Sequence, residues 1–165
     1  MRILLVGRKI EKCNRNYELF RKDLARFHDV IFYGEGYRIY YDPVTPLPEI
    51  INSYHIKPDI ILVHAPVGRL RRRLKNDCLN GLNEINIPKV HITGDYICGG
   101  RLEQKYDQYL KYFKFDLIFH SVPKITKVLQ KKNLAPVIHT LPFSVDTTLF
   151  YDMNLTRSID VMASF

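Results

Sequence analysis

The chain has 165 residues, of which 46% are hydrophobic and 25% charged, so its composition is that of a globular protein rather than a disordered one. No apolar run approaches the about 18 residues that a membrane-spanning helix needs, and the apolar start at 1–7 is too short for a signal peptide. The three cysteines, Cys13, Cys78 and Cys98, are widely spaced and offer no disulfide framework, as expected in a reducing cytoplasm.

The net charge is +8 and the isoelectric point is about 9.4. A positive excess of this size attracts nucleic acid, anionic lipid or phosphorylated ligands over a long range. The same excess also fits an ordinary basic surface on a soluble protein. Charge therefore narrows the class of partner without identifying one.

Short apolar runs alternate with longer amphipathic segments along the chain. In the first half, the runs predict buried strands at Ile3–Val6, Val30–Tyr33 and Asp59–Val63. Apolar residues spaced three and four apart predict a helix over Asn14–His28. A short helix with proline in its first turn is predicted at Pro48–His55, after an ordered loop at Tyr37–Pro46.

The second half continues the alternation. A helix is predicted on the apolar stripe Leu70, Leu74, Cys78, Leu82 and Ile85, although Gly81 weakens its last turn. Further helices are predicted at Leu102–Phe113 and Pro123–Lys132, and strands at Val90–Ile92, Asp116–Phe119 and Val137–Ile138.

Strands that are apolar throughout are buried on both faces, which is typical of a parallel sheet covered by helices. The sequence therefore predicts an α/β fold, a Rossmann-like, doubly wound and mostly parallel sheet of about six strands flanked by helices. Ligands in such folds bind at the loops that follow the carboxyl ends of the strands. Those loops are 7–14, 34–46, 64–68, 94–100 and 120–123.

Several common ligand-binding classes lack their motifs here. The loop after the first strand has neither the glycine pattern of dinucleotide-binding domains nor that of P-loop nucleotide hydrolases. That loop is basic, whereas phospho-receiver domains need acidic residues there. The chain has no serine-nucleophile elbow, and its cysteines and histidines lack metal-ligand spacing. The sequence thus predicts no metal site and no cofactor held by this domain itself.

A basic cluster follows the third strand, at Arg69, Arg71, Arg72, Arg73 and Lys75. It can serve as a patch for phosphate or anionic lipid, and thus as a peripheral contact with a membrane surface. The alternative is the solvated face of a helix. Cations at a helix N-terminus oppose the helix dipole, which slightly favours the functional interpretation.

Three residues at the presumed ligand edge can carry chemistry. His64 and His120 end strands there, so either can touch a substrate, whereas the other four histidines have structural positions. Asp95 follows the fourth strand, between Gly94 and Tyr96, where a carboxylate can act as a general base. The alternatives are a structural role for each histidine and a turn or capping role for Asp95.

The segment 141–150, Leu-Pro-Phe-Ser-Val-Asp-Thr-Thr-Leu-Phe, resembles the P-x-G-V-D-x-x-x-F segment that closes the N-terminal domain of GT-B glycosyltransferases. Pro142, Val145, Asp146 and Phe150 match, and Ser144 stands where the pattern usually has glycine. Residues 158–165 are similar to the D-V-x-F-x-G strand that starts the second domain of spore-maturation-protein-like (CgeB-type) enzymes. Shorter pieces agree in order and context, at 33–37, 57–61, 87–90 with 94–95, and 115–118.

The resemblance implies an acceptor-side domain at 1–155, followed at 156–165 by a linker and the first strand of a nucleotide-sugar domain. The alternative for Ile159–Phe165 is an edge strand added to the same sheet. The implied activity is transfer of a sugar from a nucleotide sugar, bound by the second domain, to an acceptor bound by this one. The implied base is Asp95, with His64 as the second candidate, and the residues expected to line the cleft are Gly7, Arg8, Gly34, Gly36, Tyr96 and His120.

Two other functions remain open on the sequence. One is a non-catalytic Rossmann-like module that binds a phosphorylated small molecule or a protein. The other is nucleic-acid binding, which only the charge favours and no recognition motif supports. The expected location is the cytoplasm, with or without peripheral membrane contact, and the isolated chain is expected to be catalytically silent.

Overall fold

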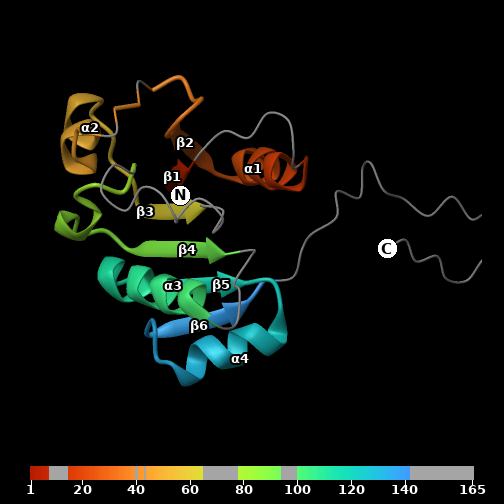
Figure 1. Cartoon of the computed structure of the whole chain (residues 1–165). Coiled ribbons are helices and arrows are strands. Elements are labelled where there is room, and N and C mark those ends of the chain that lie inside the picture. The colour runs from red at the N-terminus through yellow and green to blue at the C-terminus, as the bar shows by residue number, and fades with distance from the viewer. Residues whose placement is uncertain (8–14, 40, 43, 65–77, 94–99, 142–165) are drawn as a thin grey trace, which may run out of the picture.

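The computed structural model describes residues 1–7, 15–39, 41–42, 44–64, 78–93 and 100–141. Within these ranges the chain forms one six-stranded sheet in the order β2-β1-β3-β4-β5-β6, and every pairing is parallel. The arrows of β3, β4 and β6 point the same way in Figure 1. The strands are β1 Arg2–Gly7, β2 Asp29–Tyr33, β3 Ile60–His64, β4 Lys89–Thr93, β5 Leu117–His120 and β6 Val137–Thr140.

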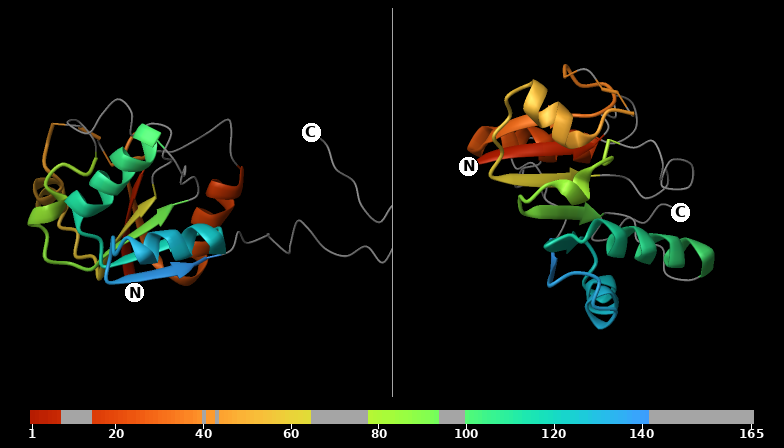
Figure 2. Two further views of the ribbon diagram at one scale, coloured as in Figure 1. Left: turned by 60° about the horizontal axis from the view of Figure 1, so that its bottom comes forward. Right: turned by 90° about the vertical axis from the view of Figure 1, so that its left-hand side faces the viewer.

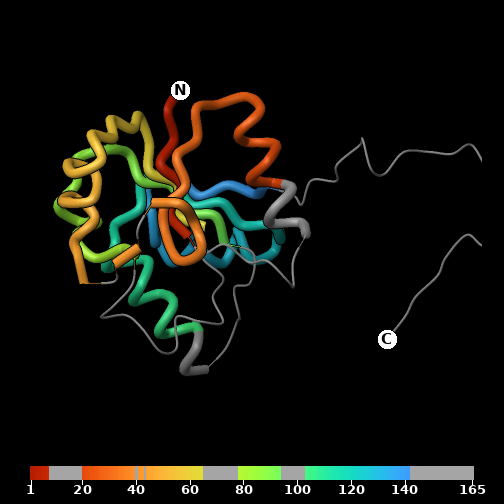
Figure 3. The backbone as a smooth tube through the Cα atoms, turned by 90° about the horizontal axis from the view of Figure 1, so that it is seen from above, coloured from red at the N-terminus to blue at the C-terminus, as the bar shows by residue number. Residues whose placement is uncertain are grey.

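Helices connect the strands and cover both faces of the sheet. The helices are α1 Arg15–Phe27, α2 Leu47–Ser53, α3 Gly100–Phe113 and α4 Pro123–Lys131, with a short 3-10 helix η2 at Leu82–Glu84. Helix α1 lies on one side of the strands and α3 on the other, as Figure 3 shows from above. The predicted α/β, Rossmann-like sheet is therefore confirmed.

The two faces of the sheet carry separate apolar clusters. The larger cluster packs α2, α3 and α4 against one face, with Leu4, Val63 and Ile118 from the strands and Leu110 and Leu129 from the helices. The smaller cluster packs α1 against the other face. Its strand residues are Ile3, Leu5, Leu62 and Val90, and α1 supplies Phe20 and Leu24. Apolar side chains on both faces explain why β1, β2 and β3 show no polar alternation.

The chain reverses its direction of progress across the sheet beside β1. It moves from β1 outward to β2, and then returns past β1 to add β3, β4, β5 and β6 in order. The views in Figure 2 show this parallel set of strands and the helices beside it. The place of reversal is the switch point of a doubly wound sheet, where ligands bind at the carboxyl ends of the strands.

One predicted helix differs from the structure. The apolar stripe was expected to stay helical to Ile85, but the described part of that stretch forms a turn and then the 3-10 helix η2. Gly81 adopts a left-handed φ of 77°, which interrupts an α-helix there. A side-chain Cβ at Gly81 would stand 2.7 Å from Cδ of Pro48, so close packing against α2 also requires glycine. The earlier part of the stripe, at 65–77, lies outside the described residues.

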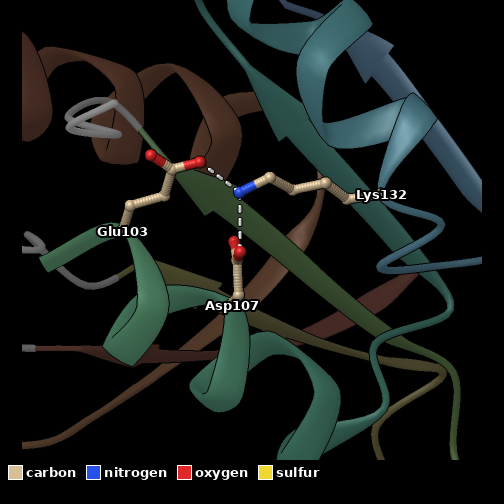
Figure 4. A network of polar contacts seen from close by, with 3 residues as sticks. All are labelled: Glu103, Asp107 and Lys132. Atoms are coloured by element: carbon tan, nitrogen blue, oxygen red, sulfur yellow. Dashed lines mark hydrogen bonds and ion pairs between the residues drawn. The ribbon is translucent and has the colours of Figure 1, made fainter. Parts of the chain in front are cut away.

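Helices α3 and α4 are connected by a partly buried ion-pair network (Figure 4). Nζ of Lys132, at the C-terminal cap of α4, lies 2.6 Å from a carboxylate oxygen of Asp107. The same Nζ also contacts Glu103, one turn earlier on α3. One lysine thus serves two carboxylates.

Across the described helices, none combines the length and the apolar character needed to cross a membrane.

Candidate functional site

Buried polar side chains occur at the carboxyl ends of three neighbouring strands. His64 is the last residue of β3, Thr93 of β4 and His120 of β5, and their exposed fractions are 3%, 1% and 1%. The strand residues that precede them are largely apolar. Parallel α/β sheets bind their ligands at the carboxyl ends of the strands, so polar side chains gathered at this edge mark a candidate site.

The opposite, amino edge of the sheet is built differently. There the carboxylate of Asp59 accepts a hydrogen bond from the backbone N–H of Arg2, at 2.7 Å, and that of Asp116 accepts one from the N–H of Lys89, at 2.8 Å. These contacts are exposed and pair charged groups with backbone donors of strand ends. The amino edge thus satisfies its own polar groups at the surface, which leaves the carboxyl edge as the better place for a ligand.

Two glycines meet at the carboxyl end of β1. A Cβ built on Gly34 would lie 2.0 Å from the carbonyl oxygen of Gly7, and Gly34 has a φ of 133°. A Cβ on Gly7 would lie 2.4 Å from the carbonyl oxygen of His64. Only glycine lets the backbone after β2 approach β1 this closely. Gly36, with a φ of 88°, completes the turn before Tyr37.

Arg21 brings a positive charge to this end of the sheet. It lies in α1, is only 6% exposed, and its guanidinium carbon stands 5.4 Å from the centroid of the Tyr37 ring. Tyr37 in turn stacks on Phe32 of β2, with centroids 5.2 Å apart. A Cβ on Gly7 would come within 3.4 Å of the Arg21 Nη2. A stacked guanidinium is weakly hydrated and suits the recognition of carboxylate or phosphate.

His64 stays neutral in this environment. Burial, first of all, and then the positive charge of Arg21 and the neighbourhood of His91 lower the pKa of His64 to about 3. Its ring packs edge-on against Phe20 of α1, with centroids 5.6 Å apart. A histidine with so low a pKa holds a proton poorly, so in this arrangement it is a weak general base.

The three polar strand ends do not form a single cluster. His64 pairs in register with Ile92, whose side chain belongs to the α1 face. Thr93 pairs with His120, and both side chains lie on the α3 face, because residues two apart in a strand share a face. The carboxyl edge therefore has two separate parts: a cationic part with Arg21 and His64, and a neutral part with Thr93 and His120.

His91 lies deeper in the sheet and has a structural role. Its Nδ1 lies 3.2 Å from the carbonyl oxygen of Val63, which can only accept, so Nδ1 carries the ring proton. Its Nε2 then accepts from the hydroxyl of Tyr106, at 2.8 Å. Burial lowers the pKa of His91 to about 3. The ring thus anchors β4 to α3 without reaching the carboxyl edge.

The structure places the sequence-predicted site residues unevenly. Gly7, Gly34, Gly36, His64 and His120 all lie at the carboxyl edge. The remaining candidates lie outside the described residues, namely Arg8, Arg69, Arg71, Arg72, Arg73, Asp95 and Tyr96.

Sequence reasoning missed two residues, Arg21 and Thr93. A signal for Arg21 was present, because it stands four residues after Tyr17 and three before Leu24, inside the apolar stripe of its helix. The signal for Thr93 was weaker. It ends a strand directly before Gly94, but its burial depends on helices that are distant in sequence.

Within the described ranges, no three histidine, cysteine or acidic side chains are grouped as a metal ion would require. Comparison of the chain with protein-family models, curated proteins and solved structures returns no match.

Proposed function

We propose that this chain binds a polar acceptor at the carboxyl edge of its sheet and is the acceptor-side half of a glycosyltransferase. The observation that carries the proposal is the burial of His64, Thr93 and His120 at the ends of three successive strands. The neutral part of this edge, at Thr93 and His120, suits the hydroxyl groups of an acceptor, and the Arg21 part lies separately on the α1 face. The donor nucleotide sugar would be bound by a second domain, as the resemblance at 141–165 implies.

In the proposed reaction the acceptor hydroxyl must lose a proton as the glycosidic bond forms. Asp95, two residues after Thr93, is the proposed base in an inverting enzyme. His64 is the weaker candidate because its pKa is lowered to about 3. Gly7 and Gly34 shape the backbone of this edge, since only glycine allows the turn after β2 to approach β1, and β1 to approach the end of β3, this closely.

A second candidate function is a non-catalytic module that binds a phosphorylated ligand. Arg21 favours it, because it places a permanent positive charge, over the Tyr37 ring, at the carboxyl edge of the sheet. Under this alternative, the chain would bind phosphate-bearing molecules tightly and transfer no sugar.

Ligand binding at the proposed edge can be tested by nuclear magnetic resonance on the 15N-labelled chain. Monosaccharides, nucleotide sugars and inorganic phosphate would be titrated separately. We expect amide shifts at Gly7, Gly34 and Ser121, next to the carboxyl ends of the strands. Shifts confined to Asp59 and Lys89 at the amino edge, or none with any probe, would contradict the proposal.

Transfer is tested in a protein that joins this chain to a nucleotide-sugar domain. For an inverting enzyme, Asp95→Asn should lower kcat on the order of 10²–10⁴-fold, because it keeps the shape of the side chain and removes the base. Donor binding should change little. A near-normal kcat, or retention of the anomeric configuration, would leave Asp95 as a turn residue.

A further inference from the structure

The ends of β4, β5 and β6 form a row of polar residues across the sheet. Thr93 pairs in register with His120, and His120 pairs with Thr140. In-register partners in a parallel sheet point to the same face, so all three side chains lie above the buried row of His91, Ile118 and Ile138 on the α3 and α4 face. The row lies beside the start of α4.

Hydrogen bonds within the fold occupy one end of this row. The hydroxyl of Thr140 donates to the hydroxyl of Thr126, at 3.0 Å, and that hydroxyl donates to the carbonyl of Val122, at 3.2 Å. The N–H of Val122 donates to Nδ1 of His120, at 2.9 Å. Since Nδ1 is the acceptor, the neutral ring of His120 carries its proton on Nε2 and presents a donor there.

Thr93 is the exception in the row. Its hydroxyl is buried, and nowhere in the described part of the chain does Oγ1 find a hydrogen-bond partner. The hydroxyl of Ser121, next to His120, is likewise enclosed without a partner among the described residues. Buried hydroxyls are almost always satisfied, so a specific exception needs an explanation. Here the exception lies at the ligand-binding edge of a central strand.

We infer that Thr93 is a ligand-binding residue, whose buried hydroxyl, in the same row as His120, takes a hydroxyl group of a neutral polyhydroxylic ligand such as a sugar. A sugar hydroxyl both donates and accepts, so it complements a threonine hydroxyl, which does the same. The inference rests on the proposed function for the role of this ligand as the acceptor. The binding claim itself concerns only these residues.

The start of α4 argues for a neutral ligand rather than a phosphate. Helix N-termini bind anions through free backbone N–H groups. Here Pro123 has no N–H, and the N–H groups of Ile125 and Thr126 donate to the carbonyl of Val122. The N–H of Val122 itself donates to His120. Lys124 and Lys127 are exposed at the helix surface. The described groups around Thr93 are therefore neutral hydroxyls and a neutral imidazole.

Thr93→Val tests the inference, with Thr140→Val as the matched control. Both variants exchange a hydroxyl for a methyl group in the same row, but only the Thr140 hydroxyl has a partner. We expect Thr140→Val to lower the urea midpoint of unfolding. Thr93→Val should leave the midpoint unchanged or raise it, because it removes a buried hydroxyl that has no partner.

Binding is measured on the same variants with glucose, galactose and mannose as probes and inorganic phosphate as the comparison. At least one sugar should shift the amides of Ser121 and Val122 in the parent chain, and its affinity should fall tenfold or more in Thr93→Val. Affinity in Thr140→Val should stay within about threefold, because the inference assigns that hydroxyl no ligand contact.

Three results would overturn the inference: a lower urea midpoint in Thr93→Val, no binding of any of the sugars, or shifts at these amides with phosphate alone. Sugar binding without any transfer in the two-domain protein would contradict the proposed function and leave the inference intact. Sugar transfer that is unchanged by Thr93→Val would contradict the inference and leave the proposed function intact.

Discussion

The hydroxyl of Tyr106 on α3 donates a hydrogen bond, 2.8 Å long, to Nε2 of the buried His91 in β4. Because the opposite nitrogen donates to the backbone of Val63, the ring is held in its neutral form by two fixed partners. Protonation would put a proton on the nitrogen that accepts from Tyr106 and would place a charge in the core. The native state therefore depends on His91 remaining neutral.

The fold should lose stability as the pH falls below about 6.5, the ordinary pKa of histidine. The pKa of His91 is about 3 in the folded chain, so between these values the unfolded chain binds more protons and stability rises with pH. Each such histidine changes the free energy of unfolding by at most about 1.4 kcal/mol per pH unit within that window. His64, with its pKa also lowered to about 3, adds a second contribution of the same sign. Urea unfolding at pH 7.5, 6.5 and 5.5 measures the slope.

A variant separates the contribution of His91 from the general effect of acid. His91→Phe removes the titrating group and keeps an aromatic ring beside Phe115, whose centroid is 4.8 Å from that of His91. Its free energy of unfolding should depend less on pH than that of the parent. Val137→Ala, at an exposed position in β6, removes no titratable group; it is the control and should keep the parent slope. An unchanged slope in His91→Phe would show that His91 does not titrate as described.

Much of the fold could be predicted from the sequence because β1, β2, β3 and β5 each contain an unbroken apolar run. The runs at Ile3–Val6 and Asp59–Val63 predict buried strands; the structure extends the first by one residue at each end and shifts the second by one residue, to Ile60–His64. Gly81 could not be interpreted correctly from spacing alone. Its left-handed φ depends on contact with Pro48, a residue 33 positions earlier in the chain.

The candidate site was less predictable than the fold. Strand ends and glycines identified Gly7, Gly34, His64 and His120, since local sequence shows where strands stop. Whether a polar side chain is buried, and on which face, depends on tertiary packing. For this reason the separation of His64 from His120 onto opposite faces could not be read from the sequence.

Replacing Lys132 with methionine should destabilise the contact between α3 and α4. The substitution keeps most of the apolar stem and leaves Glu103 and Asp107 facing each other without their shared cation. These side chains are about one quarter exposed, at 27%, 23% and 21%, so the loss should exceed that of a surface pair and reach about 1–3 kcal/mol. Chemical unfolding gives the value. Lys131→Met, at an exposed neighbouring position, should change stability by less than about 0.5 kcal/mol.

A double change provides a further check on this network. Without Lys132, the negative charges of Glu103 and Asp107 repel each other. Adding Asp107→Asn to Lys132→Met removes one of these two charges and should recover part of the lost stability. The comparison is the change in the free energy of unfolding that Asp107→Asn causes in the parent and in Lys132→Met. If the two changes are equal, Asp107 and Lys132 do not interact energetically.

Gly34→Ala should disrupt the carboxyl end of β1. The new Cβ would stand 2.0 Å from the carbonyl oxygen of Gly7. The backbone fixes the positions of both atoms, so no side-chain rotation can relieve the clash. Strained backbone together with this clash should cost at least about 2 kcal/mol in the free energy of unfolding. Arg38→Ala, at an exposed position after the same turn, is the control and should be nearly neutral. Equal stability of the two variants would mean that the close approach of β1 and the turn after β2 does not occur.

Arg21→Gln should raise the pKa of His64. Burial is the first cause of the low pKa, and the positive charge of Arg21 is the second. Removing that charge takes away part of the penalty on the imidazolium, while burial keeps the pKa below its ordinary value. Arg21→Lys retains the charge and should leave the pKa nearer to that of the parent. Titration of the His64 ring protons by nuclear magnetic resonance distinguishes the three proteins, and an unchanged or lower pKa in Arg21→Gln would refute the coupling.

This coupling also bears on which residue removes the acceptor proton. A base is most effective when its pKa lies near the working pH, and a histidine held near pKa 3 by burial and by Arg21 is far from that range. In the two-domain protein, His64→Gln should therefore lower kcat much less than Asp95→Asn does. If Arg21→Gln raises the pKa of His64 and also partly restores kcat in Asp95→Asn, His64 is able to act as the base once Arg21 is gone. A larger loss of kcat from His64→Gln than from Asp95→Asn would instead assign the base to His64 in the native enzyme.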